Sequence, residues 1–224
     1  MNDVQVIELK KSILEDNDAD AELLRNTLKA QKTCLINLMS SPGSGKTATL
    51  LALRKYFSGK LKWGVMEADI DSDVDAKTMK EAGIPSVQLH TGGMCHLDAD
   101  MTRQGIRALT AEAGPLDMIV LENVGNLVCP AEFDTGAAIN MTILSVPEGD
   151  DKPAKYPLMY ETCDLLVINK IDACAVFNFD FEKVERDAKA CNGNIRIFPV
   201  SAKTGEGIEA LAEELLAGIA AWNA

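Results

Sequence analysis

A glycine-rich segment, SSPGSGKT (residues 40–47), has the residue types and the setting of a phosphate-binding loop. It follows the apolar run LINLM and precedes the helical pattern TATLLALRKYF, which is the strand-loop-helix context that such a loop requires. Glycines let backbone N–H groups turn toward phosphate oxygens, lysine reaches the β- and γ-phosphates, and the threonine hydroxyl can bind Mg²⁺. The residues expected to bind nucleotide are Gly43, Ser44, Gly45, Lys46, Thr47 and Ala48, while Ser40 replaces the usual first glycine.

A second motif, NKID (residues 169–172), follows the apolar run LLVIN and indicates recognition of guanine. The Asp172 carboxylate can accept hydrogen bonds from the N1–H and N2–H₂ groups of guanine, a pair of donors that adenine lacks. A polar turn that merely caps a strand is the alternative. The motif lies more than a hundred residues after the glycine-rich loop, and the triplet SAK follows the next apolar run, so GTP is favoured over ATP. The residues expected near the base are Asn169, Lys170, Asp172, Ser201, Ala202 and Lys203.

Acidic residues end two other apolar runs and are candidates for magnesium binding. The second run ends in Glu-Ala-Asp (residues 67–69) and the fourth in Glu122. Because Mg²⁺ beside phosphates prefers oxygen ligands, we expect Asp69 or Glu122, directly or through water, to hold it together with Thr47 and to act in catalysis. Gly125 can offer a backbone N–H that meets the γ-phosphate and moves away when this group leaves. A solvated acidic loop explains three further residues equally well, namely Asp71, Asp73 and Asp75.

Two cysteines and a histidine form a candidate site for a softer metal. Cys95 and His96 are adjacent and follow an apolar run, and Cys129 lies only four residues after Gly125. Two thiolates and an imidazole suit Zn²⁺ or Ni²⁺ far better than Mg²⁺. Because the spacing is not a paired Cys-x-x-Cys motif, a buried cysteine and an incidental histidine remain the alternative from spacing alone.

The elements that must position these residues alternate along the chain. Strands are expected at 34–39, 63–67, 86–89, 118–121, 141–146, 165–168 and 195–200, and helices at 46–58, 74–82, 97–112, 181–190 and 206–222. This alternation predicts an α/β fold with a mostly parallel, doubly wound sheet that has helices on both faces and ligands at the carboxyl ends of its strands. A helix over about 5–31 makes residues 1–31 an N-terminal helical extension of a GTPase domain at 32–224, within one structural domain.

Composition excludes several classes of protein. The 224 residues contain 47% hydrophobic and 25% charged residues and carry a net charge of −12, without a basic cluster. Nucleic acid and anionic membrane surfaces are therefore not expected as partners. The start of the chain is acidic and lacks the apolar region of a signal peptide, so we expect a cytoplasmic protein whose six cysteines are thiols or metal ligands.

These motifs together resemble the HypB family of nickel-incorporation GTPases, which belongs to the SIMIBI class of P-loop NTPases. The resemblance runs from about residue 5 to the end of the chain and rests on SSPGSGKT, TGGMCHLDADM, ENVGNLVCPAEFDTG, SVPEGDDKPAKYP, NKID and SAKTGEG. It implies hydrolysis of GTP to GDP coupled to insertion of nickel into a hydrogenase large-subunit precursor. It also implies a nickel or zinc site at Cys95, His96 and Cys129, a nucleotide- or metal-dependent homodimer, and a HypA-type metallochaperone as partner.

Other functions remain open at this point. A urease-type nickel GTPase shares the nucleotide motifs but carries a Cys-Pro-His triplet, which this chain lacks. A scaffold that binds GTP without turnover and a signalling GTPase with incidental cysteines are further alternatives. No arginine finger is evident, so we expect slow hydrolysis, and Lys152 or Lys155 could contact nucleotide across a dimer.

Overall fold

The computed structural model describes residues 9–69 and 74–224 and contains one seven-stranded sheet with the strand order β3-β2-β4-β1-β5-β6-β7. Every strand pairing is parallel. The strands are β1 (Cys34–Ser40), β2 (Trp63–Asp69), β3 (Ser86–His90), β4 (Met118–Glu122), β5 (Ile139–Ser145), β6 (Leu165–Asn169) and β7 (Arg196–Pro199). Because β1 lies between β4 and β5, its carboxyl end opens at the point where the direction of strand addition reverses.

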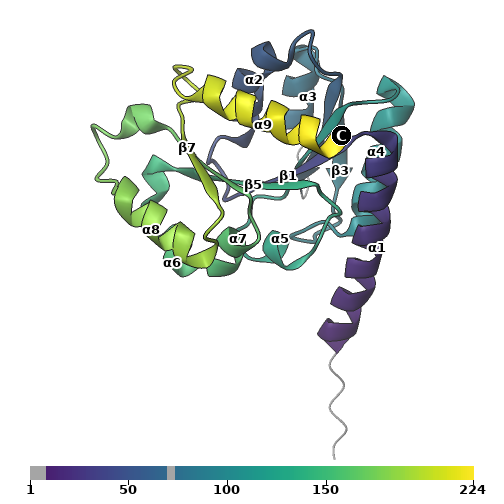
Figure 1. The fold of residues 1–224 in the computed structure, drawn as a ribbon, viewed down its shortest axis with the longest axis horizontal. Helices are drawn as coiled ribbons and strands as arrows, with labels where there is room; N and C mark the ends of the chain where they lie inside the picture. Colours follow the sequence, from purple (N-terminus) through teal and green to yellow (C-terminus); the bar gives the residue numbers. More distant parts are fainter. Residues whose placement is uncertain (1–8, 70–73) are drawn as a thin grey trace, which may run out of the picture.

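Helices cover both faces of the sheet, as Figure 1 shows. They are α1 (Leu9–Gln31), α2 (Lys46–Phe57), α3 (Val74–Glu81), α4 (Ala99–Ala113), α5 (Cys129–Glu132), α6 (Lys152–Lys155), α7 (Pro157–Glu161), α8 (Phe181–Cys191) and α9 (Ile208–Asn223). Two short 3₁₀ helices are η1 (Val146–Glu148) and η2 (Ile171–Ala173). One apolar core lies between the sheet and α2, α3 and α9, and two others lie on the opposite face beneath α1 with α4 and beneath α7 with α8. The predicted doubly wound α/β class is confirmed.

Helix α1 is packed into the domain by an apolar stripe along one side. Its buried positions are Asn17, Ala21, Leu24 and Leu28, and their spacing of four, three and four residues keeps them on one face of a helix. The neighbouring Leu23 lies off this face, and its side chain is 64% exposed. The end of α1 lies against the last helix of the chain.

That terminal contact involves three groups. Trp222 Nε1–H donates to the Thr33 carbonyl over 3.0 Å, and the Lys29 ammonium lies 5.0 Å from the centre of the Trp222 ring. The same ammonium donates to the Trp222 carbonyl. The contact joins α9 to the residues between α1 and β1.

Most predicted boundaries agree with the structure to within two residues, and the differences fall on short elements. The turn-like helices α5, α6 and α7 were not predicted, because four or five residues give no helical periodicity. Two predicted acidic residues, Asp71 and Asp73, lie outside the described residues. Within 9–69 and 74–224, no helix combines the length and apolar character that a membrane span requires.

Candidate functional site: a nucleotide pocket beside a thiol-bearing loop

The glycine-rich loop joins the carboxyl end of β1 to the first turn of α2. Gly43 and Gly45 have φ values of 75° and 100°, a left-handed conformation that only glycine adopts without strain. A side chain at Gly45 would also place its Cβ 2.5 Å from Asn169 Nδ2. Ser44 Oγ is 2.7 Å from Ser40 Oγ, so the serine in place of the usual glycine fastens the base of the loop. The loop therefore directs the amino end of α2, which begins at Lys46, toward the space above β1, where a phosphate group would be bound.

The NKID motif is bound directly to this loop. Asn169 Nδ2 donates to the Ser44 carbonyl over 2.9 Å, and the Lys170 ammonium donates to the Gly43 carbonyl over 2.6 Å. Lys170 itself has a φ of 63°, which is unusual for a residue with a side chain. The predicted guanine-reading and phosphate-binding residues are thus parts of one connected site, although they are 125 residues apart.

The SAK triplet completes this side of the pocket. Ser201 Oγ donates to Asp172 Oδ1 over 2.7 Å, and the Ala202 N–H donates to Asn169 Oδ1 over 3.1 Å. The Asp172 side chain is exposed, with one carboxylate oxygen fixed by Ser201. Lys203 is exposed as well. The prediction that a backbone N–H near Ala202 meets the base stays a prediction, since this N–H contacts Asn169.

Glu122, one of the two expected magnesium ligands, ends β4 below the glycine-rich loop. Its Oε1 accepts from the Thr47 hydroxyl over 3.1 Å and lies 3.9 Å from the Lys46 ammonium. Glu67 is its direct register partner on β2, so both side chains reach the same place. Glu67, Asp75 and Glu122 are, among the described residues, the one group of three metal-binding side chains whose donor atoms all lie within 4.8 Å of one another.

Both glutamates of this group are buried, and their charges repel each other. Burial first and the neighbouring Glu122 second raise the pKa of Glu67 far above its usual range, and burial raises the pKa of Glu122. Burial and mutual repulsion therefore both disfavour simultaneous ionisation of the two carboxyl groups. Oxygens of both, Glu67 Oε1 and Glu122 Oε2, are buried without a hydrogen-bond partner.

The oxygen donors of this group fit a magnesium ion. Glu67 and Glu122 line a cavity of about 40 Å³, and each has one buried carboxylate oxygen without a hydrogen-bond partner. The Thr47 hydroxyl, which is bonded to Glu122, adds a third oxygen donor. Asp69, the other expected ligand, also lines this cavity, but it lies at the exposed end of β2. Sequence reasoning did not choose Glu67, because only the register between β2 and β4 places it beside Glu122.

Gly125 lies in the loop that follows β4 and touches the glycine-rich loop. A Cβ at this position would lie 2.9 Å from Pro42 Cγ and 3.1 Å from Pro42 N, so the close approach requires glycine. Asn126 Oδ1 accepts from the Val128 N–H over 2.7 Å and more weakly from the Cys129 N–H over 3.4 Å. These bonds form the turn that leads from Gly125 into α5, whose first residue is Cys129.

The predicted soft-metal residues come together in part. The Cys129 thiol lies beside Cys95, and this interaction, followed by burial, raises the pKa of Cys129. Cys95 Sγ lies 3.8 Å from His96 Nδ1. The His96 ring stacks on Phe133 with a centroid distance of 3.7 Å. The donor atoms of Cys95, His96 and Cys129 do not all lie within 4.8 Å of one another, as those of the three acidic residues do. Two thiols and an imidazole nevertheless suit Ni²⁺ or Zn²⁺ chemically.

The two lysines considered for nucleotide contact are bound to their own loop. Lys152 lies 3.0 Å from Asp151 and donates to the Glu148 carbonyl, and Lys155 lies 2.5 Å from Asp151. These bonds to Lys155 and Lys152 hold the pKa of Asp151 at about 2. All six cysteines are free thiols, as expected, and Cys34 and Cys163 are buried while the other four are partly buried.

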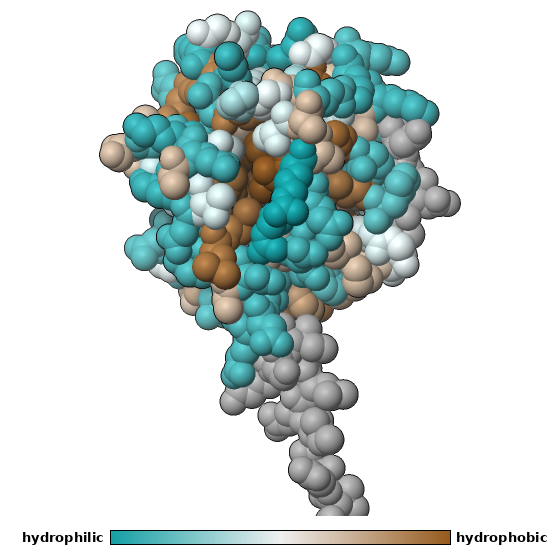
Figure 2. Space-filling view, turned by 90° about the vertical axis from the view of Figure 1, so that its right-hand side faces the viewer, coloured by the Kyte–Doolittle hydropathy of each residue, from teal (hydrophilic) through white to brown (hydrophobic). Residues whose placement is uncertain are grey.

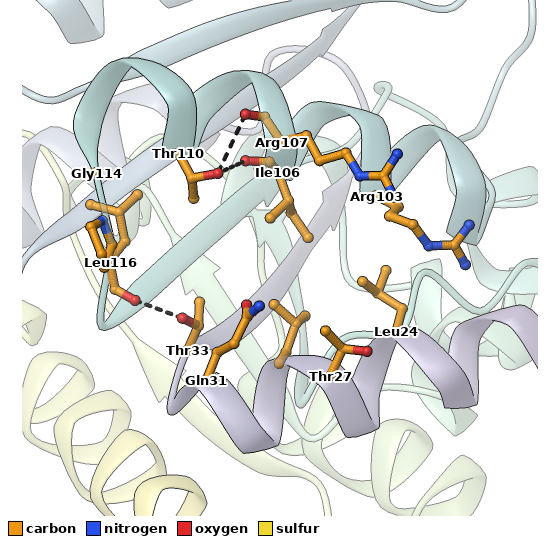
Figure 3. A pocket seen from close by; sticks show the side chains of 12 residues that line it. Leu24, Thr27, Gln31, Thr33, Arg103, Ile106, Arg107, Thr110, Gly114 and Leu116 are labelled. Atoms are coloured by element: carbon orange, nitrogen blue, oxygen red, sulfur yellow. Dashed lines mark hydrogen bonds between the residues drawn. The ribbon is translucent and has the colours of Figure 1, made fainter.

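A separate cavity of about 730 Å³ lies between α1 and α4, away from the nucleotide pocket (Figure 3). Its floor includes Leu24 and Ile106, and Arg103 and Arg107 line it from α4. Figure 2 shows a strip of apolar side chains on the molecular face that includes α1 and α4, bordered by hydrophilic residues. None of the residues predicted to bind nucleotide or metal lines this cavity.

Comparisons with known proteins agree with this geometry. The model of the CobW/HypB/UreG nucleotide-binding domain matches residues 34–199. Hydrogenase maturation factor HypB of Rhizobium leguminosarum bv. viciae is 40% identical over 210 residues, which cover 94% of this chain and 70% of that protein.

Two solved structures extend the comparison to the fold. HypB from Helicobacter pylori, crystallised in complex with nickel, superimposes with a TM-score of 0.86 at 37% identity, over 91% of this chain and 95% of that one. The signal recognition particle 54 kDa protein from Aeropyrum pernix K1, in complex with GDP, has a TM-score of 0.56 at 15% identity, over 91% of this chain and 54% of that one. This second likeness concerns the fold alone, which is the expected SIMIBI type of P-loop NTPase. By sequence and by structure, the chain belongs to the CobW/HypB/UreG family and, within it, to the HypB group.

Proposed function

We propose that this protein is a GTPase that couples binding and slow hydrolysis of GTP to the delivery of nickel into a hydrogenase large-subunit precursor. Nickel is its cargo, held by Cys95, His96 and Cys129, and zinc is the other ion that these ligands would accept. Magnesium is held by Thr47 and the buried glutamates and would neutralise phosphate charge during hydrolysis. The protein acts in the cytoplasm, where thiols stay reduced.

Selection of GTP is supported by the connected pocket. The Asn169 amide and the Lys170 ammonium tie the base-reading loop to the glycine-rich loop, so base and phosphates are read by one rigid unit. Lys46 supplies the cation beside the β- and γ-phosphates. Slow hydrolysis is expected because the cations at the glycine-rich loop, among the described residues, are the lysines Lys46 and Lys170. An arginine finger, where one is present, raises the rate of hydrolysis by about 10³–10⁵-fold.

The proposed coupling to nickel rests on one observation, which is the set of contacts made by the loop between β4 and α5. This loop contacts Pro42 through Gly125 and, four residues later, contacts Cys95 through the Cys129 thiol. A γ-phosphate that draws the Gly125 N–H toward itself therefore moves Cys129 relative to Cys95 and His96. By linkage, nickel must then change the affinity for nucleotide as much as nucleotide changes the affinity for nickel.

The proposed partners are a second copy of the chain, a HypA-type metallochaperone and the hydrogenase precursor. Support for the homodimer comes from an exposed apolar pair just after the NKID motif. Val176 is 82% exposed and Phe177 is 41% exposed, and they follow Asp172 by four and five residues. Apolar side chains so close to the nucleotide pocket suit an interface whose strength depends on the bound nucleotide.

The test is a Ni²⁺ titration of the reduced, metal-stripped protein with GDP and with a non-hydrolysable GTP analogue. Thiolate-to-nickel absorption and calorimetry should give affinities that differ by about 5- to 150-fold, the range of a typical coupling free energy. Tight but equal affinities for Ni²⁺ in the two nucleotide states would indicate a static metal site and a scaffold function. Absence of Ni²⁺ binding in both states would indicate a GTPase that carries no nickel. Release of phosphate over many turnovers separates the proposed enzyme from a scaffold that only binds GTP.

A further inference from the structure

Asn17 occupies a position on α1 where the helix pattern calls for an apolar side chain. It lies four residues before Ala21 and seven before Leu24 on the buried stripe, and it is only 8% exposed. A polar side chain in such a place is tolerated when its hydrogen bonds are fulfilled. The partners of its amide therefore indicate what the residue does.

Both ends of the Asn17 amide bind backbone groups, one in the loop after α5 and the other at the first residue of α4. The Nδ2 group donates to the Asp134 carbonyl over 2.9 Å, five residues after Cys129. The Oδ1 atom accepts from the Ala99 N–H over 2.9 Å, three residues after His96. One side chain thus joins the segment that carries Cys129 to the segment that carries Cys95 and His96.

Two arginines strengthen the attachment of α1 at positions that follow Asn17. Arg25 binds both carboxylate oxygens of Asp134, at 2.8 and 2.6 Å, and its Nε donates to the Ala137 carbonyl over 3.1 Å. Arg103 of α4 lies 3.3 Å from Asp20. The Arg25 Nη2 group thus lies between both oxygens of the Asp134 carboxylate, while Nε holds the backbone three residues later.

Apolar packing alone does not fix α1 against α4. A cavity of about 730 Å³ lies between the two helices beside Leu24, as Figure 3 shows, although Leu24 and Leu28 also share one apolar core with Ile106 and Leu109. Because the apolar contact is incomplete at the cavity, the polar bonds at Asn17 and Arg25 add a directional constraint on α1 relative to the two thiol-bearing segments.

We infer that Asn17 is a positioning residue for the metal site, which holds the Cys95–His96 segment and the Cys129 segment at the distance that nickel binding needs. This inference rests on the proposed function, because it concerns the same three ligands. Helix α1 then sets the affinity for nickel without contacting the metal, and a shift of α1 changes that affinity.

The test compares three variants with the unaltered full chain. Asn17→Leu removes both bonds but preserves the size of the side chain and suits the apolar stripe. Asn26→Leu makes the same exchange on the exposed side of α1. Leu28→Ala weakens the core beneath α1 without touching either loop, and so reports the effect of lost stability alone.

Two measurements are made on each protein, together with its melting temperature and its affinity for GDP. The first is the dissociation constant for Ni²⁺. The second needs no metal and is the rate at which diamide, which accepts two electrons and two protons, joins the Cys95 and Cys129 thiols in a disulfide. Mass spectrometry of the linked peptide distinguishes this disulfide from others.

In the Asn17→Leu protein we expect nickel affinity to fall about 10- to 100-fold, as it does when outer partners of metal ligands are removed, and the disulfide to form several times more slowly. Affinity for GDP should not change. The Asn26→Leu and Leu28→Ala proteins should keep both properties. Unchanged nickel affinity and disulfide rate in Asn17→Leu would overturn the inference, as would an equal loss in Leu28→Ala. If the unaltered protein binds no nickel while Asn17→Leu alone slows the disulfide, the proposed cargo is wrong and the positioning role remains.

Discussion

Replacement of Glu67 by glutamine should make the metal-free protein more stable at alkaline pH. Glu67 and Glu122 are buried register partners, and burial and the charge of Glu122 raise the pKa of Glu67 to about 11, so Glu67 keeps a proton in the folded chain at neutral pH. In the unfolded chain both carboxyl groups have ordinary pKa values of about 4.3 and are ionised at neutral pH. The folded chain therefore binds one more proton than the unfolded chain.

The sign and size of the effect follow from this difference in bound protons. The free energy of unfolding must fall by about 1.4 kcal/mol for each unit by which the pH rises above the ordinary glutamate pKa, until the folded pair itself loses its proton. Between pH 6 and pH 8 this amounts to a loss of about 2.7 kcal/mol. Glutamine at position 67 has no proton to lose, and its amide can donate to Glu122 while Lys46 and Thr47 stabilise the remaining charge. The loss should largely disappear.

Urea unfolding at pH 6, 7 and 8, with EDTA and without nucleotide, measures this directly. The advantage of Glu67→Gln over the unaltered protein should grow by about 2.7 kcal/mol from pH 6 to pH 8. Glu112→Gln, a change on the exposed surface of α4, is the matched control and should follow the unaltered protein. If Glu67→Gln and the unaltered protein lose stability in parallel over this range, Glu67 does not retain a proton in the folded chain and the electrostatic description of the pocket is wrong.

Three further substitutions test the site. Gly45→Ala should lower GTP affinity at least tenfold and destabilise the fold by about 1–3 kcal/mol, because position 45 has a φ of 100° and the new Cβ would meet the Asn169 amide. Gly193→Ala is the control, because open space surrounds this position, and it should change neither the GTP affinity measured by calorimetry nor the melting temperature. Asp172→Asn should shift nucleotide preference from GTP toward xanthosine triphosphate in competition binding, and an unchanged preference would contradict guanine reading by this carboxylate. Cys129→Ala should weaken Ni²⁺ binding at least tenfold and abolish its dependence on nucleotide, as titration with GDP and a GTP analogue would show; retention of both would exclude the loop as the coupling element.

The sequence predicted best those features that depend on neighbouring residues. The glycine-rich loop and NKID could be recognised because their chemistry lies within a few consecutive residues between a strand and a helix. The fold class followed from the alternation of apolar runs with helical patterns. Neither inference required knowledge of which strands are neighbours.

Features that depend on strand order were harder to predict. Glu67 and Asp69 both point to one face of β2, and only the pairing of Glu67 with Glu122 across β2 and β4 selects the buried one. Asn17 was missed for a related reason. A polar residue in line with Ala21 and Leu24 is a detectable signal, but its two backbone partners lie 117 and 82 residues away.

The contact between Lys29 and Trp222 imposes an order on assembly. These residues are separated by 193 positions, so at a synthesis rate of about 5–20 residues per second α1 leaves the ribosome roughly 10–40 s before the residue that closes over its end. The sheet can form around β1 in the meantime, yet α1 remains open at its carboxyl end until Trp222 has been made. A stop codon just before Trp222 would leave every proposed nucleotide and metal ligand in the chain but release the end of the helix that carries Asn17.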